Sequence, residues 1–347
     1  MSKKLTIILG AGASYSQNTD PKPLDHQEYR PPLTQGIFSR SRSFGAILHK
    51  YPLVETIASD INRRLKQNKP REGLEQILRS YEERLLQGED SIITRQFLQV
   101  PLYLNDLFGE VSQHFTTQPD EYNTLVSQAV DHADQILFLT LNYDTLLEIP
   151  LSINFSVDFS KSSHYTSNPK WMLVKLHGSI NWYRGFNSYQ MSGTEENDYF
   201  ENLKSQTLPL SLSDKYMMTA IPGHQHKFIG NSPTYPAITI PVDGKYKLSC
   251  PPEMLERAKS FLKECENFLI IGTSGNDKDL LDLLKENAKG GNTLIVGCEE
   301  ESTKRTNANF LNTVPQLGGI VNRYFHKRGF SEFVDSGELD NFLVRLR

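Results

Sequence analysis

The chain has 347 residues, of which 38% are hydrophobic and 22% charged, so it is long and apolar enough for a large folded unit and too apolar for a disordered one. The formal net charge of −4 excludes a global basic field of the kind that nucleic-acid-binding proteins carry. Its three cysteines include no CxxC pair, which argues against a disulfide framework or a zinc ribbon and predicts a reducing, cytoplasmic location.

The N-terminal segment predicts a strand followed by a tight turn. Leu5–Leu9 is a continuous apolar run that ends in Gly10-Ala11-Gly12, which is typical of a buried parallel strand. This run is too short for the apolar part of a signal peptide, and no stretch of the chain is as long as a membrane span, so we expect no contact with a membrane. Residues 18–35 are polar and proline-rich and predict a loop. Helical spacing of apolar residues then predicts a helical insertion over residues 36–129.

Strand character returns in the middle of the chain. Gln135–Leu141 predicts a strand that ends in Asn142-Tyr143-Asp144, and Thr145 and Glu148 match the capping box of a following helix. Met172–Leu176 predicts another strand, which ends in His177-Gly178. Residues 186–249 are polar and weakly periodic, and predict an irregular or β-rich insertion over one edge of the core.

The last third of the sequence alternates between helix and strand. We expect strands at 268–271, 293–296 and 320–325, with helices near 253–265, 277–286 and 338–346 and one more between the last two strands. Such alternation predicts a doubly wound α/β fold with a Rossmann-like parallel sheet. The core of this single unit is predicted to comprise residues 1–35, 130–185 and 250–347.

Glycine and polar residues gather where the predicted strands end. These clusters are Gly10-Ala11-Gly12-Ala13-Ser14, Asn142-Tyr143-Asp144, His177-Gly178-Ser179, Gly272-Thr273-Ser274 and Gly297-Cys298-Glu299. In open parallel sheets, ligands bind outside the carboxyl ends of the strands. The sequence therefore predicts that these clusters line one crevice.

The first cluster can bind a pyrophosphate. Gly10 and Gly12 allow a close backbone approach, and the helix that follows offers amide groups to an anion. Tyr15 stands where the dinucleotide-binding fingerprint has its third glycine, so the match to that fingerprint is partial. The alternative is a tight turn between strand and helix with no ligand.

Asn142 and His177 are the candidate catalytic residues. The amide of Asn142 can orient a ribose hydroxyl or a water molecule, and His177 can exchange a proton near neutral pH. Both have a purely structural alternative, and Asp144 is expected to be mainly structural. Gly272, Thr273, Ser274 and Gly297 are candidates for the rest of a nucleotide, or else for simple turns; Glu299 is a candidate contact of the adenosine ribose.

Several other residues are assigned no catalytic or binding role. His224 and His226 lack a third ligand at metal spacing, so we expect no metal. Trp171 and Trp182 are expected to pack in the core, and Cys298 to act as a small apolar filler.

Taken together, the motifs carry a family resemblance. GAGAS at 10–14, TLNYD at 140–144, LHGSINW at 176–182 and GTS at 272–274 resemble the ordered motifs of sirtuins. More closely, they resemble the SIR2-like domains of bacterial antiphage defence NADases. The resemblance spans residues 5 to about 300, and the combination of NYD with HGSINW is its most specific part.

The resemblance implies NAD as the bound molecule and substrate. By position it implies Asn142 and His177 as catalytic residues, and it implies cofactor contacts for Gly10, Ala11, Gly12, Ser14, Asp144, Gly272, Thr273 and Ser274. It also implies hydrolysis of NAD+ to nicotinamide and ADP-ribose by a regulated effector of antiphage defence. Because unrestrained hydrolysis of NAD+ would harm the host, the resemblance implies an activating partner protein or a homo-oligomer.

Two departures from deacylating sirtuins matter. Those enzymes carry a four-cysteine zinc module after the HG motif, which this chain lacks, and they read TQN where this chain reads TLNYD. Both departures favour hydrolysis over lysine deacylation. The remaining alternatives are an NAD-dependent deacylase and a catalytically silent NAD- or nucleotide-binding sensor or scaffold.

Overall fold

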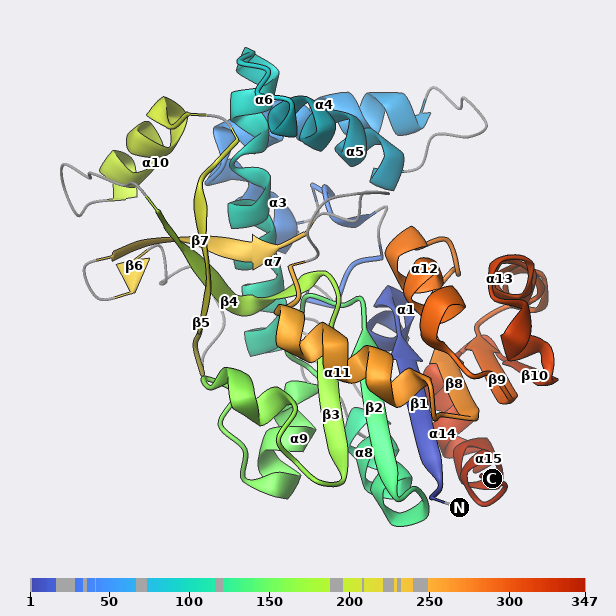
Figure 1. The fold of residues 1–347 in the computed structure, drawn as a ribbon. Helices are drawn as coiled ribbons and strands as arrows, with labels where there is room; N and C mark the ends of the chain where they lie inside the picture. The colour runs from blue at the N-terminus through green and yellow to red at the C-terminus, as the bar shows by residue number, and fades with distance from the viewer. Residues whose placement is uncertain are drawn as a thin grey trace.

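A parallel sheet of six strands forms the centre of the protein (Figure 1). The computed structural model describes residues 2–16, 29–33, 36–40, 42–66, 74–115, 121–187, 196–207, 209–220, 228–229, 232–239 and 249–346. The sheet contains β1 (Lys4–Leu9), β2 (Gln135–Thr140), β3 (Trp171–Lys175), β8 (Asn267–Ile271), β9 (Asn292–Gly297) and β10 (Ile320–Phe325), in the order β10-β9-β8-β1-β2-β3. Each of these strands was predicted to within one or two residues at either end.

Helices cover both faces of this sheet. Figure 1 shows α11 (Pro252–Leu262) and α12 (Lys278–Asn287) in front of the strands, and α8 (Glu121–His132) and α14 (Phe330–Asp335) behind them. Helix α13 (Glu300–Thr313) packs on β9 and β10, and α15 (Glu338–Leu343) packs on α8 and α14. With both faces covered, the strands need apolar side chains in both directions, and Leu5, Ile7 and Ile8 are all fully buried. The predicted doubly wound α/β fold is confirmed.

The strand order places a crevice between β1 and β8. Counted along the chain, the strands follow the order 3-2-1-4-5-6, in which the direction of winding reverses between the first and fourth strands. In doubly wound sheets, ligands bind outside the carboxyl ends of the strands at such a point of reversal. The short helix α1 (Ala11–Tyr15) follows β1 here, as Figure 1 shows.

A group of helices lies beyond the carboxyl ends of the strands (Figure 1). It contains α3 (Arg42–His49), α4 (Pro52–Lys66), α5 (Leu74–Leu86), α6 (Ile92–Phe97) and α7 (Val100–His114). All of them fall within the predicted insertion 36–129, as does most of α8, which packs on β2 of the central sheet. The division of the chain into a core and insertions remains a proposal.

A second, antiparallel sheet packs against α7. Its strands are β4 (Gly178–Phe186), β5 (Leu212–Met218), β6 (Phe228–Ile229) and β7 (Ser232–Ile238), in the order β5-β4-β7-β6, with α10 (Glu196–Ser205) beside them. Strand β4 was not predicted, because the motif that contains it was interpreted as a strand end and a turn. The chain reverses at Gly178, whose φ is +81° and where a Cβ atom would lie 1.8 Å from the carbonyl oxygen of Ala237. This turn holds His177 at the corner between the two sheets.

The predicted capping box is wrong. Helix α9 (Glu148–Phe155) begins two residues later than expected, and its N-cap residue, Leu147, has no side-chain cap. Glu148 forms a buried ion pair with Lys175 instead of reaching back to Thr145. The reason lies in the tertiary structure. A buried charge at the end of β3 is costly without a counter-charge, and this outweighs the smaller gain from capping the start of α9.

Some sequence predictions fall on residues that the structure leaves undescribed. Of the loop 18–35, only residues 29–33 are described, and both His224 and His226 lie outside the described ranges. Within those ranges, no helix has the length and apolar character that crossing a membrane requires.

Candidate active site

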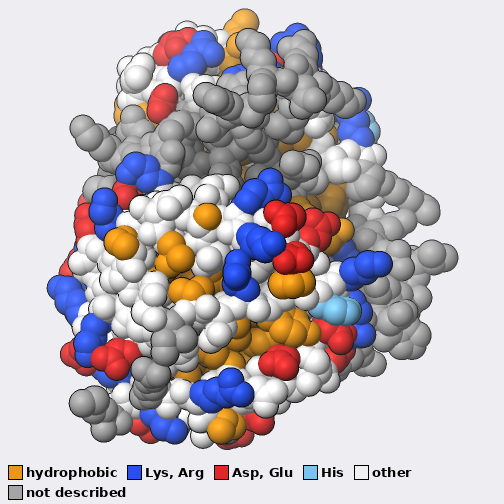
Figure 2. All heavy atoms as spheres, turned by 90° about the vertical axis from the view of Figure 1, so that its right-hand side faces the viewer, with side chains coloured by type: hydrophobic (Ala, Val, Ile, Leu, Met, Phe, Trp, Pro, Cys, Tyr) orange, Lys and Arg blue, Asp and Glu red, His pale blue; other side chains and the backbone are white. Residues whose placement is uncertain are grey.

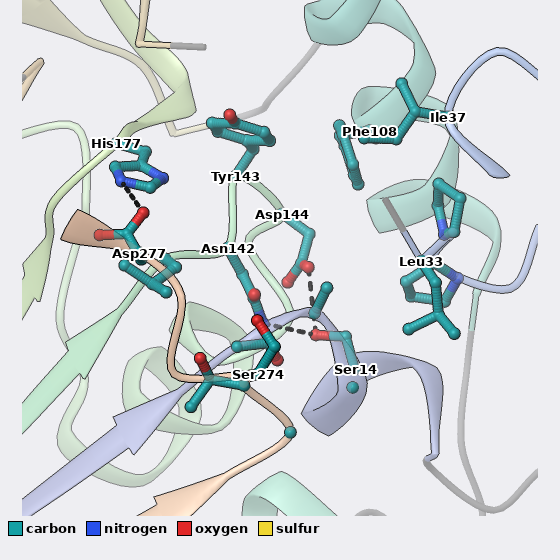
Figure 3. Close-up of a pocket in the computed structure, with 18 of the residues that line it drawn as sticks. Ser14, Leu33, Ile37, Phe108, Asn142, Tyr143, Asp144, His177, Ser274 and Asp277 are labelled. Carbon is teal, nitrogen blue, oxygen red and sulfur yellow. Dashed lines mark hydrogen bonds and ion pairs between the residues drawn. The ribbon is translucent and has the colours of Figure 1, made fainter. Parts of the chain in front are cut away.

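A cavity of about 420 Å³ opens at the carboxyl ends of β1, β2, β3 and β8 (Figure 3). The ten residues for which the family resemblance implied a catalytic or cofactor-binding role all line it: Asn142, His177, Gly10, Ala11, Gly12, Ser14, Asp144, Gly272, Thr273 and Ser274. The further candidates Gly297 and Glu299 do not line it. The remaining wall is largely apolar. Tyr143 belongs to a predicted cluster, whereas the other lining residues were not foreseen: Pro31, Pro32, Leu33, Ile37, Leu78, Leu104, Phe108, Leu141 and Asp277. Side chains from distant parts of the sequence thus meet at the crevice that the strand order creates.

The loops after β1 and β8 are joined directly. The amide of Gly10 donates to the carbonyl oxygen of Ile271 (3.0 Å), and the amide of Gly12 donates to that of Gly272 (2.8 Å). Gly272 has φ +67°, and a Cβ atom there would lie 2.0 Å from the amide nitrogen of Ala13. The glycines are therefore required by the contact between the two loops, before any ligand is considered. The amide of Gly12, which was expected to bind an anion, already donates a hydrogen bond within the protein.

Asn142 connects the end of β2 to the first loop. Its side-chain nitrogen donates to the carbonyl oxygen of Gly10 and to Oγ of Ser14, both at 3.1 Å. Its backbone amide donates to Oγ1 of Thr140 at 3.0 Å. Since the donors of the amide group face the protein, its oxygen Oδ1 is the atom of this side chain that can contact a ligand.

Ser14 is the centre of a buried polar network. Besides accepting from Asn142, its hydroxyl lies 3.1 Å from Oδ2 of Asp144 and 2.9 Å from the hydroxyl of Tyr122. Burial raises the pKa of Asp144, against the opposing charge of Lys175 and hydrogen bonds from the Leu146 amide and Ser14. Ser14 and Asp144 therefore hold the wall of the cavity and position Asn142.

A buried ion pair lies beneath this network. Nζ of Lys175 is 2.7 Å from Oε1 of Glu148 and donates to the carbonyl oxygen of Asp144 at 2.5 Å. Burial raises the pKa of Glu148, although the charge and the hydrogen bond of Lys175 act in the opposite direction. This pair fixes the loop between β2 and α9 to the end of β3. The only sequence signal for it was a lysine at the end of an otherwise apolar strand.

His177 is paired with a carboxylate that the sequence analysis missed. Its Nε2 lies 3.0 Å from Oδ2 of Asp277, and Figure 3 shows the two side chains facing each other at one end of the cavity. Oδ1 of Asp277 accepts the amide of Leu280 at 2.8 Å, as the N-cap of α12. Burial alone would raise the pKa of Asp277, but the charge and hydrogen bond of His177, with the Leu280 amide, lower it. The signal that could have found it was an aspartate just before an apolar helical pattern.

A second cavity, of about 770 Å³, adjoins the first. The two share Gly12, Leu33, Gly272, Thr273 and Ser274, and the second extends past Gly297 and Cys298 at the end of β9. Cys298 is exposed, so its interpretation as an apolar filler is wrong; Trp171 and Trp182 are buried, which confirms that they pack in the core. The joined loops thus separate a cavity containing His177 from a larger one.

No metal-binding cluster is evident in the parts of the chain that the structure describes, where no group of three His, Cys, Asp or Glu side chains could hold an ion. The candidate chemistry of the site rests on a histidine, a carboxylate and an amide. These groups can orient a hydroxyl or a water molecule and accept its proton.

Comparisons with known proteins point to one family. The family model described as "SIR2-like domain" matches residues 136–313, just over half of the chain. A Sir2 homologue in complex with NAD is 16% identical, with 99% of this chain and 91% of that chain covered and a TM-score of 0.40. A mutant Sir2 homologue in complex with 2′-O-acetyl ADP-ribose is 15% identical, with 100% and 95% covered and a TM-score of 0.44. No curated protein matches the sequence. The likeness to these structures is too distant to support an argument about function.

Proposed function

Since the chain belongs to the SIR2-like domain family, we propose that it hydrolyses NAD+ to nicotinamide and ADP-ribose in the cavity that contains His177. The observation that carries this proposal is the pair of His177 and Asp277, 3.0 Å apart at the wall of that cavity. A histidine held by a carboxylate is the arrangement that a general base requires, because the carboxylate orients the ring and stabilises its protonated form.

The two adjoining cavities suit a dinucleotide. We place the nicotinamide ribose in the cavity with His177 and the pyrophosphate near the loops that end in Gly12 and Ser274, with the adenosine in the larger cavity. This placement follows the rule that ligands of doubly wound sheets bind where the strand order reverses, here between β1 and β8. Gly12, Gly272, Thr273 and Ser274 line both cavities, as a pyrophosphate bridging them would need.

The reaction breaks one bond and forms another. The bond between C1′ of the ribose and the nicotinamide nitrogen breaks, and its electron pair goes to the nitrogen, so the cationic ring leaves as neutral nicotinamide without a general acid. A water oxygen then bonds to C1′, and its proton passes to His177. Asp277, whose Oδ2 lies 3.0 Å from Nε2, stabilises the imidazolium by its charge. Oδ1 of Asn142 accepts a hydrogen bond from the water or from a ribose hydroxyl.

The apolar wall assists this chemistry. Leu33, Ile37, Leu104 and Phe108 line the side of the cavity beyond the polar network, as Figure 3 shows for Leu33, Ile37 and Phe108. Bulk water is excluded from such a surface, and the interactions of the charged ribose with fixed protein groups are strengthened accordingly.

Two alternatives make different predictions. A chain with three cysteines cannot build a four-cysteine zinc module, which disfavours the deacylase. A deacylase would release O-acetyl-ADP-ribose from an acetylated peptide. A silent sensor or scaffold would bind NAD+ saturably and release no nicotinamide.

The test is nicotinamide release from NAD+, followed by chromatography with the protein alone and with the products of its neighbouring genes. We expect His177→Ala to lower turnover by about 10²–10⁴-fold, and Asn142→Ala to lower it through loss of positioning. Matched controls are His164→Ala and Asn154→Ala, because both side chains lie outside the cavities and hydrogen-bond elsewhere. Full turnover in His177→Ala would remove this residue from the mechanism.

We further propose that the protein acts in the cytoplasm as a regulated effector of antiphage defence that depletes NAD+. Control by a partner protein or by self-assembly follows from the harm that constant hydrolysis would cause, and the helical segment 36–129 is our candidate for that contact. In phage-infected cells, the wild-type protein should lower the NAD+ level and protect the culture, whereas His177→Ala should do neither. Protection without loss of NAD+ would contradict the proposal.

A further inference from the structure

The larger cavity carries positive charge on its lining. Arg30, Arg305, Lys327 and Arg328 line it, and no aspartate or glutamate does so among the described residues. Figure 2 shows the face of the molecule formed by the α13 and β10 side, where acidic and basic side chains occur next to each other. The excess of positive charge is therefore a property of the cavity and not of the whole face.

Among the described residues, no carboxylate lines the larger cavity at a position that could recognise an unmodified ribose. In doubly wound dinucleotide-binding proteins, an acidic side chain accepts hydrogen bonds from the 2′-hydroxyl of the adenosine ribose, whereas an arginine accommodates a 2′-phosphate. Glu299, at the end of β9, is the acidic residue nearest this role in the sequence. It is exposed and lines neither cavity, so the structure does not support it as a ribose contact.

Three hydroxyl groups of the cavity already donate hydrogen bonds within the protein. The hydroxyl groups of Ser302 and Thr303 donate to the carbonyl oxygen of Glu299, at 3.0 and 2.6 Å. Thr306 donates to the carbonyl oxygens of Thr273 and Ser302. The basic side chains are thus the strongest donors that this part of the cavity offers to a ligand.

The basic residues of the larger cavity differ in the groups that they contact. Arg328 forms ion pairs with Glu332 and Asp335, and Arg30 lies over the rings of Tyr15 and Phe115 and donates to the carbonyl oxygen of Tyr15. Arg305 on α13 and Lys327 after β10 form no ion pair with any residue in the described ranges. These two cations, one on α13 and one just after β10, line the same cavity and fit a doubly charged phosphate.

We infer that this cavity receives an adenosine whose ribose carries a 2′-phosphate, so that the substrates of the enzyme include NADP+. This inference rests on the proposed function, because it assigns the adenosine half of the same dinucleotide. Arg305 and Lys327 contact the added phosphate, whereas Asn142 and His177 act on the nicotinamide ribose that NAD+ and NADP+ share.

The first experiment measures binding and needs no turnover. Adenosine 2′,5′-bisphosphate and 5′-AMP are titrated into the wild-type protein in a calorimeter, with adenosine 3′,5′-bisphosphate as the positional control. We expect the 2′,5′ compound to bind at least about tenfold more tightly than the other two, as a pair of charge-assisted hydrogen bonds allows. Equal binding of the three compounds, or a preference for the 3′,5′ isomer, would overturn the inference even if NAD+ is hydrolysed.

The second experiment compares kcat/KM for NAD+ and NADP+. The double variant Arg305→Ala/Lys327→Ala should lose about tenfold on NADP+ and little on NAD+. The matched control is Lys304→Ala/Arg323→Ala, which removes equal charge from α13 and β10 at residues outside both cavities. An equal loss on both substrates in the first double variant would contradict the inference. Failure to release nicotinamide from either dinucleotide would refute the proposed function, while the binding preference would still decide the inference.

Discussion

Asp277 contacts His177 and the start of helix α12 with different oxygen atoms of one carboxylate. Oδ2 lies 3.0 Å from Nε2 of the histidine, and Oδ1 accepts the amide of Leu280 at 2.8 Å. The helix thereby fixes the carboxylate, and the carboxylate fixes the ring. This relationship joins the corner after β3 to the segment after β8, two parts of the chain separated by about a hundred residues.

Substitutions of Asp277 should distinguish the effects of its two contacts, one on kcat and one on stability. Asn caps a helix about as well as Asp, so Asp277→Asn should keep α12 intact while lowering kcat by roughly 10²-fold, because the developing imidazolium loses its counter-charge. Asp277→Ala should lose about 1 kcal/mol more of unfolding free energy, owing to the missing cap. Nicotinamide release and urea unfolding measure the two effects. Asp282→Asn on the same helix is the control, and an unchanged kcat in Asp277→Asn would disprove the role of the pair.

The carboxylate of Asp277 should make the free energy of unfolding depend on pH in a direction that can be predicted. The pKa of Asp277 is lowered from its ordinary value of 3.8, so its contribution to the unfolding free energy is present above that value. It is lost as the pH falls through the lower pKa of the folded state. The difference in unfolding free energy between the wild type and Asp277→Asn should shrink as the pH falls below about pH 4. The raised pKa values of Asp144 and Glu148 act in the opposite direction, but both variants share them and they cancel. A difference that grows with acidity would contradict this assignment.

Ser14 should act by positioning Asn142. Ser14→Ala removes the acceptor of one Asn142 hydrogen bond and the donor to Asp144, and should cost about 1–3 kcal/mol of unfolding free energy. We expect kcat/KM to fall about tenfold, since the amide loses one of two fixed contacts. The control is Ser160→Ala, whose hydroxyl contacts Asp158 on the surface. If stability falls and kcat/KM does not, Ser14 supports the fold alone.

The buried pair of Lys175 and Glu148 should be strongly non-additive. Lys175→Met leaves the carboxylate of Glu148 buried without its partner and should cost about 3–5 kcal/mol. The double variant Lys175→Met/Glu148→Leu removes both charges and should recover much of that loss. Urea unfolding of the two single variants and the double variant measures the coupling. Additive losses would show that the pair does not stabilise the loop between β2 and α9.

Gly272 should tolerate no side chain. Ala at this position would be strained at φ +67° and would also place its Cβ 2.0 Å from the amide nitrogen of Ala13, so we expect a loss of about 3 kcal/mol or more. Gly337 is a matched control, because its φ is +77° and nothing lies within 4 Å of the added atom. Gly337→Ala should therefore show the cost of the backbone alone, about 1 kcal/mol. Equal losses of unfolding free energy in Gly272→Ala and Gly337→Ala would mean that the loops after β1 and β8 can move apart at no cost in free energy.

Local patterns in the sequence were sufficient for the central sheet. The run Leu5–Leu9 and the later strands are continuous apolar segments because both faces of a parallel sheet are buried. Their glycine and polar ends mark the same edge, since parallel strands all end there. The residues that the strand ends contribute to the smaller cavity, such as Gly10, Asn142 and Ser274, could therefore be predicted without knowing the order of the strands.

Contacts between distant segments could not be predicted in this way. The sequence placed Glu148 in a capping box with Thr145, three residues away. In the structure it forms an ion pair with Lys175 at the end of strand β3. Asp277 was visible only as the start of a helix, and its second contact, with His177, depends on how the two halves of the sheet meet. The sequence by itself determined which segments are strands and which residues lie at their ends. The tertiary structure decided which charges meet, because the Coulomb energy of a buried group depends on its neighbours in space and not on its neighbours along the chain.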